Sequence, residues 1–309
     1  LSEGCPAMKV KFWGVRGSYP VPGISTNKFG GNTPCLEVRL DNEQLIIIDA
    51  GTGIRPFGLS LMNNGFSSGK GRADILISHT HWDHIQGFPF FKPLFVDGNQ
   101  FTIHARPSNH LHLKEIMAYQ NKDYYLPIPF NAVKANLNFM EIEADQKFKI
   151  GDAVVKTFKL NHPNIAIGYR IEADGKIFAY VSDTAPFENV LIGEQFIPKP
   201  PTTLTEEEQR ILSELQFKLN SVLEDVDFMV YDTFFQVNEY MKNPHWGHST
   251  PEHGIDLCLE SGVQRMALFH HAPGNSDEIL DGMQNYYRQK SKETHVEVIV
   301  AREGEEIIL

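Results

Sequence analysis

The segment His79-Thr80-His81-Trp82-Asp83-His84 constrains this chain more than any other stretch. It carries three imidazoles and one carboxylate, and it directly follows the apolar run Ile75-Leu76-Ile77, which predicts a buried strand. Histidine and aspartate are ligands of borderline divalent metals such as zinc. A loop that leaves a rigid strand end can aim such side chains at one point. The segment therefore predicts a metal site at the edge of a sheet, rather than a solvated polar loop.

Length and composition bound the fold class. The chain has 309 residues, of which 41% are hydrophobic, so it can bury a large core. No apolar stretch approaches the roughly 20 residues of a membrane-spanning helix. Residues 1–7 lack the pattern of a signal peptide, and we interpret them as a tail or processing remnant outside the fold. Three widely spaced cysteines fit a reduced cytoplasmic protein better than a disulfide framework.

The charge balance bears on the partners. Lys and Arg total 28 against 39 Asp and Glu, which gives a formal net charge of −11. An acidic surface repels polyanions at long range, so a large nucleic-acid partner is disfavoured. A small phosphodiester remains compatible, because the charge of bound metal dominates its own cleft. We expect a small phosphodiester substrate and no membrane partner, and the sequence leaves a homodimer open.

The pattern of predicted elements indicates an α/β fold. Strands dominate the first half, and helices are interspersed later, one of them after the proline-rich break at 198–201. Helices are predicted at 55–67, 107–120, 205–224, 251–261 and 277–290, with Thr205 as the cap of the third and Ser249 or Thr250 as the cap of the fourth. The predicted strands include a hairpin that turns at Asp174-Gly175 and strands at 228–232 and 265–270. We predict a single domain over residues 8–309, with two sheets between helical layers and a helical insertion around 185–225.

Three further potential ligands follow the same pattern as the histidine-rich segment, an apolar strand that ends in a metal-binding side chain. His162 follows Phe158-Lys159-Leu160, Asp183 comes two residues after Val181, and His270 follows Phe269. A lone residue of this kind is more often a turn or core residue. Their joint occurrence with the first motif favours ligands positioned by a sheet.

The ordered set resembles the ligand set of the metallo-β-lactamase fold, and the resemblance runs from about residue 8 to the C-terminus. It implies an αββα sandwich of two mixed β-sheets flanked by helices, with metals at one edge. It also implies that a first metal is bound by His79, His81 and His162, that a second is bound by Asp83, His84 and His270, and that Asp183 bridges them. Aspartate instead of cysteine at position 183 is similar to the hydrolase and phosphodiesterase branches. The neighbouring His271 stays open as an alternative to His270, although the preceding strand lines up with His270.

Two divalent ions, zinc by preference with manganese open, suit this ligand set. Against Asp83 and Asp183 they leave a charge of about +2, which a bridging hydroxide reduces to about +1. Such a centre attracts a phosphodiester anion and lowers the pKa of the bridging water.

A second pair of segments indicates which branch of this fold family the chain resembles. Asp232 lies in Tyr231-Asp232-Thr233-Phe234, and His248 lies in Gly247-His248-Ser249-Thr250. These segments resemble motifs of tRNase Z-like phosphodiesterases, in which a strand-end acid, usually Glu, pairs with a histidine that faces the scissile phosphate. An acid-oriented imidazole can donate a proton to a departing alkoxide. The predicted catalytic residues are therefore His248, Asp232 and Asp83, with an incidental histidine at a helix cap as the alternative.

Other features favour a small substrate. No long Gly- and Lys-rich arm for gripping tRNA is visible. The loops 14–18, 30–33 and 49–55 resemble those of bacterial phosphodiesterases for which cyclic nucleotides are plausible substrates. Their glycines suit either close approach to a phosphate or tight turns. Asp49 is expected to brace the metal loop rather than bind metal. The aromatics at 124–125 and 234–235 suit either base stacking or core packing.

Three functions compete. The leading hypothesis is a binuclear phosphodiesterase that hydrolyses a small cyclic nucleotide or related cyclic phosphate through a metal-bridging hydroxide. The second is an RNA 3′-end processing endonuclease of tRNase Z type. A non-catalytic metal-binding sensor is the third, and the completeness of the seven-residue ligand set argues against it.

Overall fold

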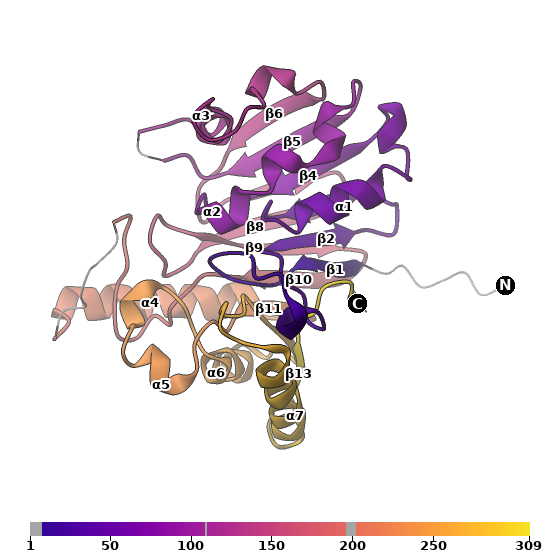
Figure 1. Ribbon diagram of the computed structural model, residues 1–309. Coiled ribbons are helices and arrows are strands. Elements are labelled where there is room, and N and C mark those ends of the chain that lie inside the picture. Colours follow the sequence, from indigo (N-terminus) through magenta and orange to yellow (C-terminus); the bar gives the residue numbers. More distant parts are fainter. Residues whose placement is uncertain (1–7, 109, 196–201) are drawn as a thin grey trace. The chain divides into compact units, whose positions relative to one another are not determined.

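The computed structural model describes residues 8–108, 110–195 and 202–309 (Figure 1). The chain divides into two compact units. The first comprises the residues up to Glu143 together with Arg302–Ile308, and the second comprises Ala144–Ala301 with Leu309. Each unit is built on one seven-stranded sheet. The single domain predicted over 8–309 stays a prediction. No helix in the described ranges is long and apolar enough to cross a bilayer.

The sheet of the first unit is mixed. Its strand order is β14-β1-β2-β3-β4-β5-β6, antiparallel from β14 to β3 and parallel from β3 to β6. The strands are β1 (Lys9–Gly14), β2 (Cys35–Arg39), β3 (Leu45–Ile48), β4 (Arg72–Leu76), β5 (Gln100–Ala105), β6 (Asn136–Glu141) and β14 (Glu306–Ile308). The central strand β3 consists of four consecutive aliphatic residues because both of its faces are buried.

Three helices accompany this sheet, α1 (Ile54–Leu61), α2 (Trp82–Ile85) and α3 (Leu113–Tyr119) (Figure 1). The helix predicted at 55–67 ends at Leu61, because the turn-forming Asn63-Asn64-Gly65 follows and Gly65 has a φ of 85°. The helix predicted at 107–120 begins only at Leu113. His112 is extended there, with ψ 151°, and it forms a capping box with Glu115.

The sheet of the second unit has the order β13-β12-β11-β10-β9-β8-β7. It is antiparallel from β7 to β10 and parallel from β10 to β13. The strands are β7 (Lys147–Ile150), β8 (Ala153–Lys159), β9 (Ile167–Ala173), β10 (Lys176–Val181), β11 (Phe228–Asp232), β12 (Arg265–Phe269) and β13 (Glu297–Val300). The predicted turn between β9 and β10 is confirmed, with positive φ at both Asp174 and Gly175.

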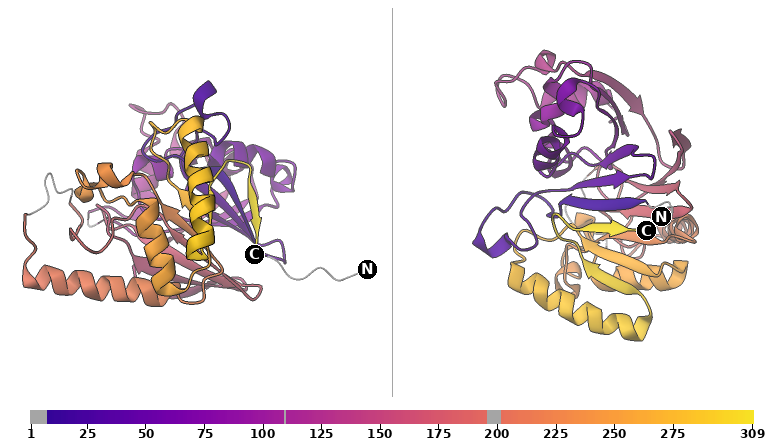
Figure 2. Two further views of the ribbon diagram at one scale, coloured as in Figure 1. Left: turned by 90° about the horizontal axis from the view of Figure 1, so that it is seen from below. Right: turned by 90° about the vertical axis from the view of Figure 1, so that its right-hand side faces the viewer.

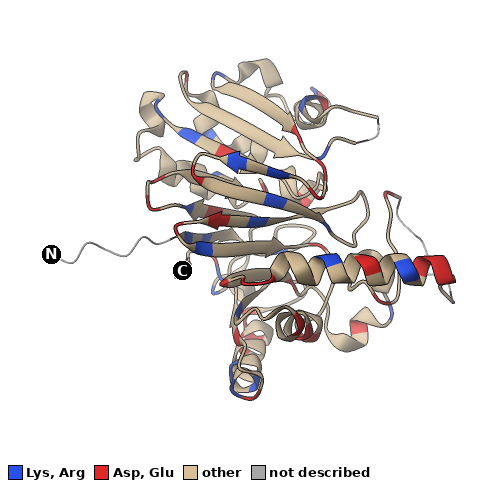
Figure 3. Cartoon of the chain, turned by 180° about the vertical axis from the view of Figure 1, so that it is seen from behind, with Lys and Arg blue, Asp and Glu red and all other residues tan. Residues whose placement is uncertain are grey.

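The described part of the second unit has four α-helices, of which the first and third begin at their predicted caps and the second was not predicted. They are α4 (Glu206–Leu223), α5 (Val237–Tyr240), α6 (Pro251–Ser261) and α7 (Asp277–Thr294), and α7 lies along β13 (Figure 2). Thr205 caps α4, and Thr250 rather than Ser249 caps α6. Acidic and basic residues alternate along α4 (Figure 3), where Arg210 pairs with Glu207 and Glu214. This helix lies within the predicted insertion, of which residues 196–201 fall outside the described residues.

Candidate metal centre

The histidine-rich loop of the first unit leaves the carboxyl end of β4, as predicted. The side chains His79, Asp83 and His84 are buried, with 3%, 7% and 0% exposure. The ring centroids of His79 and His81 are 4.4 Å apart, and those of His79 and His84 are 4.3 Å apart. Four potential ligands thus lie within a segment of six residues. The short helix α2 turns Asp83 and His84 back toward His79.

Asp49 holds the loop from the end of the neighbouring strand β3. Its Oδ2 lies 2.7 Å from Nδ1 of His84, and its carboxylate accepts hydrogen bonds from the backbone N–H and the hydroxyl of Ser78 at 2.8 and 2.9 Å. Because Nδ1 of His84 is engaged, Nε2 is the nitrogen that can bind a metal. Asp49 thus has the bracing position that was predicted for it.

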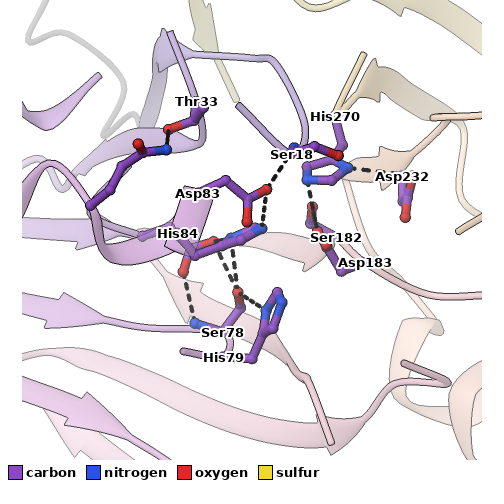
Figure 4. A network of polar contacts seen from close by, with 12 residues as sticks. Ser18, Thr33, Ser78, His79, Asp83, His84, Ser182, Asp183, Asp232 and His270 are labelled. Atoms are coloured by element: carbon purple, nitrogen blue, oxygen red, sulfur yellow. Dashed lines mark hydrogen bonds and ion pairs between the residues drawn. The ribbon is translucent and has the colours of Figure 1, made fainter. Parts of the chain in front are cut away.

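A backbone group of the glycine-rich loop at 14–18 holds the Asp83 carboxylate in place. Its Oδ2 accepts a hydrogen bond from the backbone N–H of Ser18 at 2.8 Å and lies 3.4 Å from Nε2 of His84 (Figure 4). This role of Ser18 could not be predicted from the sequence, because a backbone donor leaves no side-chain signature. Gly51 also serves close packing, since a Cβ there would lie 2.4 Å from the Asp83 carbonyl oxygen.

The second unit brings four strand ends to one edge of its sheet. The parallel strands β10, β11 and β12 are adjacent, so Asp183, Asp232 and His270 leave the same edge. The strand β8, two antiparallel steps from β10, runs in the same direction and delivers His162 there. Asp183 and His270 have φ of 65° and 58°, and Asp49 of the first unit has 60°. Such left-handed conformations of non-glycine residues are uncommon and concentrate at functional sites.

Asp183 lies between two imidazoles. Its Oδ2 is 3.7 Å from Nε2 of His162, and its Oδ1 is 3.2 Å from Nε2 of His270 (Figure 4 shows the second contact). Each carboxylate oxygen therefore faces a different histidine, as expected of a carboxylate that bridges two ions. The Nδ1 of His162 lies 2.8 Å from the Gly247 carbonyl oxygen, which leaves Nε2 as its metal-binding atom.

The pair predicted from the second motif is present. The Nδ1 of His248 lies 2.8 Å from Oδ2 of Asp232, and the Asp232 side chain is fully buried. Its carboxylate also accepts hydrogen bonds from the backbone N–H groups of Thr184 and Phe234 at 3.1 and 3.0 Å. The Phe234 ring stacks on His248, with centroids 4.6 Å apart. These contacts hold the His248 ring in place and leave its Nε2 atom available to react.

A second brace behind this pair was not predicted. The Tyr231 hydroxyl lies 2.9 Å from Oγ of Ser249, which donates to the Thr184 carbonyl oxygen at 2.6 Å. Burial raises the pKa of Tyr231 well above its usual value, so its hydroxyl stays protonated. The brace ties the segment that carries His248 to β11 and to the residue that follows Asp183.

Four further histidines make contacts outside the predicted ligand set. The Nε2 of His271 lies 2.9 Å from the Ala301 carbonyl oxygen, a contact that favours His270 as the ligand. The exposed His112 lies on the surface, with Nδ1 3.1 Å from Oε1 of Glu141. His104 lies 2.8 Å from Asp74, and His253 packs on Tyr240.

The donor chemistry fits divalent metals. In the second unit, His162, Asp183 and His248 offer ligand atoms within 4.8 Å of one another, and so do Asp232, His248 and His270. Two of the predicted histidine ligands, His84 and His162, have Nδ1 held by an oxygen, which is the usual arrangement of metal-binding imidazoles. Of the seven predicted ligands, four lie in the first unit and three in the second.

Comparison with known proteins places this geometry in context. Residues 44–203 match the family described as the beta-lactamase superfamily domain. The chain is 23% identical over 322 residues to ribonuclease Z of Nitrosopumilus maritimus, covering 97% of this chain and 99% of the relative. It is similar to the metallo-β-lactamase fold protein YhfI from Bacillus subtilis, with a TM-score of 0.66, 15% identity, and coverage of 98% of this chain and 100% of the other. For unliganded yeast PDE1 the TM-score is 0.64, with 15% identity and the same coverage. The predicted fold is confirmed.

Proposed function

Because the chain belongs to the β-lactamase superfamily, we propose that it is a binuclear metal-dependent phosphodiesterase that hydrolyses a small cyclic nucleotide or related cyclic phosphate. The enzyme class predicted from the sequence, a metal-dependent hydrolase, is confirmed by this membership together with the relatives. The observation that carries the finer proposal is the buried Asp232–His248 pair beside Asp183, His162 and His270. A cytoplasmic location stays a prediction from the cysteine content.

The proposed ligands are those predicted from the sequence, and zinc is the proposed metal, with manganese as the alternative. His79, His81 and His162 would bind one ion, Asp83, His84 and His270 the other, and Asp183 both. When bound, two such ions activate water at neutral pH and neutralise charge on phosphoryl oxygens.

The residues of the chain supply the proton. Asp232 accepts from Nδ1–H of His248 and stabilises the imidazolium, so that Nε2–H can be donated to the departing ester oxygen. The two backbone N–H groups on Asp232 hold this carboxylate in place while His248 changes charge. Proton donation by His248 suits a substrate whose leaving oxygen departs poorly as an alkoxide, such as the oxygen of a ribose hydroxyl.

The size of the substrate is proposed from charge. A net charge of −11 opposes the long basic footprint that a structured RNA requires. RNA 3′-end processing is the second candidate, because the relative from Nitrosopumilus maritimus is a ribonuclease Z.

One experiment separates these candidates. Metal-loaded protein is incubated with 2′,3′- and 3′,5′-cyclic nucleotides and, in parallel, with a precursor tRNA that carries a 3′ trailer. We expect turnover of a cyclic nucleotide and no cleavage of the precursor. Cleavage at the trailer without cyclic nucleotide hydrolysis would establish the second candidate. If both substrates stay intact while elemental analysis finds two ions per chain, the sensor hypothesis is favoured instead.

A further inference from the structure

A cavity of about 360 Å³ opens beside the histidine-rich loop, within the first unit. Thr80, Trp82 and Ile85 line it from the loop and α2, and Tyr119, Gln120 and Tyr125 line it from α3 and the segment that follows. Its volume is in the range of small-molecule sites. All of these residues belong to the same compact unit as the loop.

The lining is aromatic and unusually exposed. Trp82, Tyr119 and Tyr125 have exposures of 67%, 48% and 65%. The rings of Tyr119 and Tyr125 lie 6.4 Å apart at an interplanar angle of 35°. Clustered apolar surface of this kind on a soluble unit marks a binding site. Flat rings that face solvent suit a flat, apolar ligand, because stacking requires no matching hydrogen-bond pattern.

The cavity adjoins the loop that carries four of the predicted metal ligands. His79 and His84 are buried, whereas Thr80 and Trp82 of the same six-residue segment form the cavity wall. Trp82 is the sequence neighbour of both His81 and Asp83, so a group bound against its ring contacts the segment that carries these residues.

Two polar features mark the rim. The Nε2 of Gln120 is covered and has no hydrogen-bond partner among the described residues. An amide rotation would offer that donor to an acceptor on a bound ring. The Lys122 ammonium lies 3.9 Å from the Tyr119 ring centroid, which brings positive charge to this edge of an acidic chain. A ligand with an aromatic ring, acceptor atoms and an attached anion matches these features.

We propose that this cavity binds the nucleobase of the substrate, stacked against Trp82 and Tyr125. The proposal rests on the proposed function, because it requires a substrate in which a base is attached to the scissile phosphate. The base would then position the phosphodiester for the metals, and Gln120 would favour bases with an acceptor on the inserted edge. Loss of one stacking ring is expected to weaken binding of the base about tenfold or more.

Calorimetry on the metal-loaded protein tests the proposal with adenosine 5′-monophosphate and ribose 5-phosphate, which differ in the base. We expect adenosine 5′-monophosphate to bind at least tenfold more tightly. Trp82→Ala and Tyr125→Ala should remove most of that preference and leave the affinity for ribose 5-phosphate unchanged. Tyr286→Ala, at a ring of 58% exposure on α7 of the second unit, is the matched control and should keep the preference.

Fluorescence gives an independent readout, since a stacked base quenches indole emission. Adenosine 5′-monophosphate should quench the wild type, and Trp82→Phe should abolish the quenching. Equal affinity for the two ligands, no binding of adenosine 5′-monophosphate, or a preference that survives Trp82→Ala would overturn the base pocket. Hydrolysis of cyclic nucleotides with unchanged KM in both alanine variants would also overturn it, while leaving the proposed function intact. A Trp82-dependent preference without hydrolysis would support the pocket and count against the proposed function.

Discussion

The Nδ1 of His248 lies 2.8 Å from the Oδ2 of Asp232, a buried carboxylate that also accepts two backbone hydrogen bonds. The carboxylate cannot rotate away, because three donors hold it. The relationship therefore fixes both the tautomer and the orientation of His248. An imidazole held in this way is suited to transferring a proton rather than to filling a gap in the core.

His248→Ala should lower kcat by about 10²–10⁴-fold without changing metal content, because a general acid is lost. The loss should shrink with a nitrophenyl phosphodiester, whose leaving group needs no proton. Asp232→Asn should give a milder version of this pattern. Elemental analysis and kinetics on both substrates provide the measurement. Equal losses on the two substrates would assign His248 to phosphate binding, and a fall in metal content would make it a ligand.

Asp183→Ala should remove metal from the protein and reduce activity more than any single histidine substitution, because its two oxygens face two different histidines. His271→Ala is the matched control, since that ring contacts the Ala301 carbonyl oxygen. We expect the control to retain both ions by elemental analysis. Full metal content in Asp183→Ala would remove this residue from the site, and loss of one ion in His271→Ala would shift the ligand to position 271.

Gly247→Ala should weaken metal binding as well as stability. Gly247 has a φ of 82°, and a Cβ there would lie 2.4 Å from Nδ1 of His162. Gly175→Ala is the control, because its φ is 69° and nothing lies within 4 Å of its Cβ. The control should lose about 1 kcal/mol of unfolding free energy through backbone strain and keep its metals. Metal titration and chemical denaturation distinguish the two. Identical behaviour of both variants would mean that His162 tolerates displacement.

The stability of the protein should fall as the pH is lowered below about 6.5, partly through His253. Burial lowers the pKa of His253 in the folded state, so the unfolded chain binds a proton at a pH where the folded chain does not. The contribution of the neutral His253 ring to the free energy of unfolding is therefore complete above the pKa of the unfolded state. It declines as the pH falls toward the lower pKa of the folded state.

The measurement is urea denaturation at pH 7 and pH 5.5 with the wild type and His253→Gln. The variant should lose less stability over this interval. His295→Asn, at an exposed left-handed position after α7, is the control and should keep the wild-type dependence. A pH dependence that is unchanged in His253→Gln would exclude this ring as its source.

Several parts of the fold and site were predictable from local pattern. The hydrophobic period predicted strands at 228–232 and 265–270, and the structure has the first in full and the second up to Phe269. The predicted caps, Thr205 and either Ser249 or Thr250, indicated where α4 and α6 begin. The histidine-rich loop predicted its own cluster, since its potential ligands lie within six residues. Where prediction failed, as for the helix at 107–120, a capping contact between His112 and Glu115 competed with the apolar period.

The sequence by itself determined the residue types and the strand ends at which they occur, because side-chain chemistry and hydrophobic period are local properties. The tertiary structure alone decided which groups meet across the sheet. The parallel register of β10, β11 and β12 brings Asp183, Asp232 and His270 to one edge, although 87 positions separate the first from the last (270 − 183). It also decided that a backbone N–H of Ser18 holds Asp83 and that the carbonyl of Gly247 holds His162. Backbone donors and acceptors are identical in every such residue, so only the folded chain shows which of them a side chain uses.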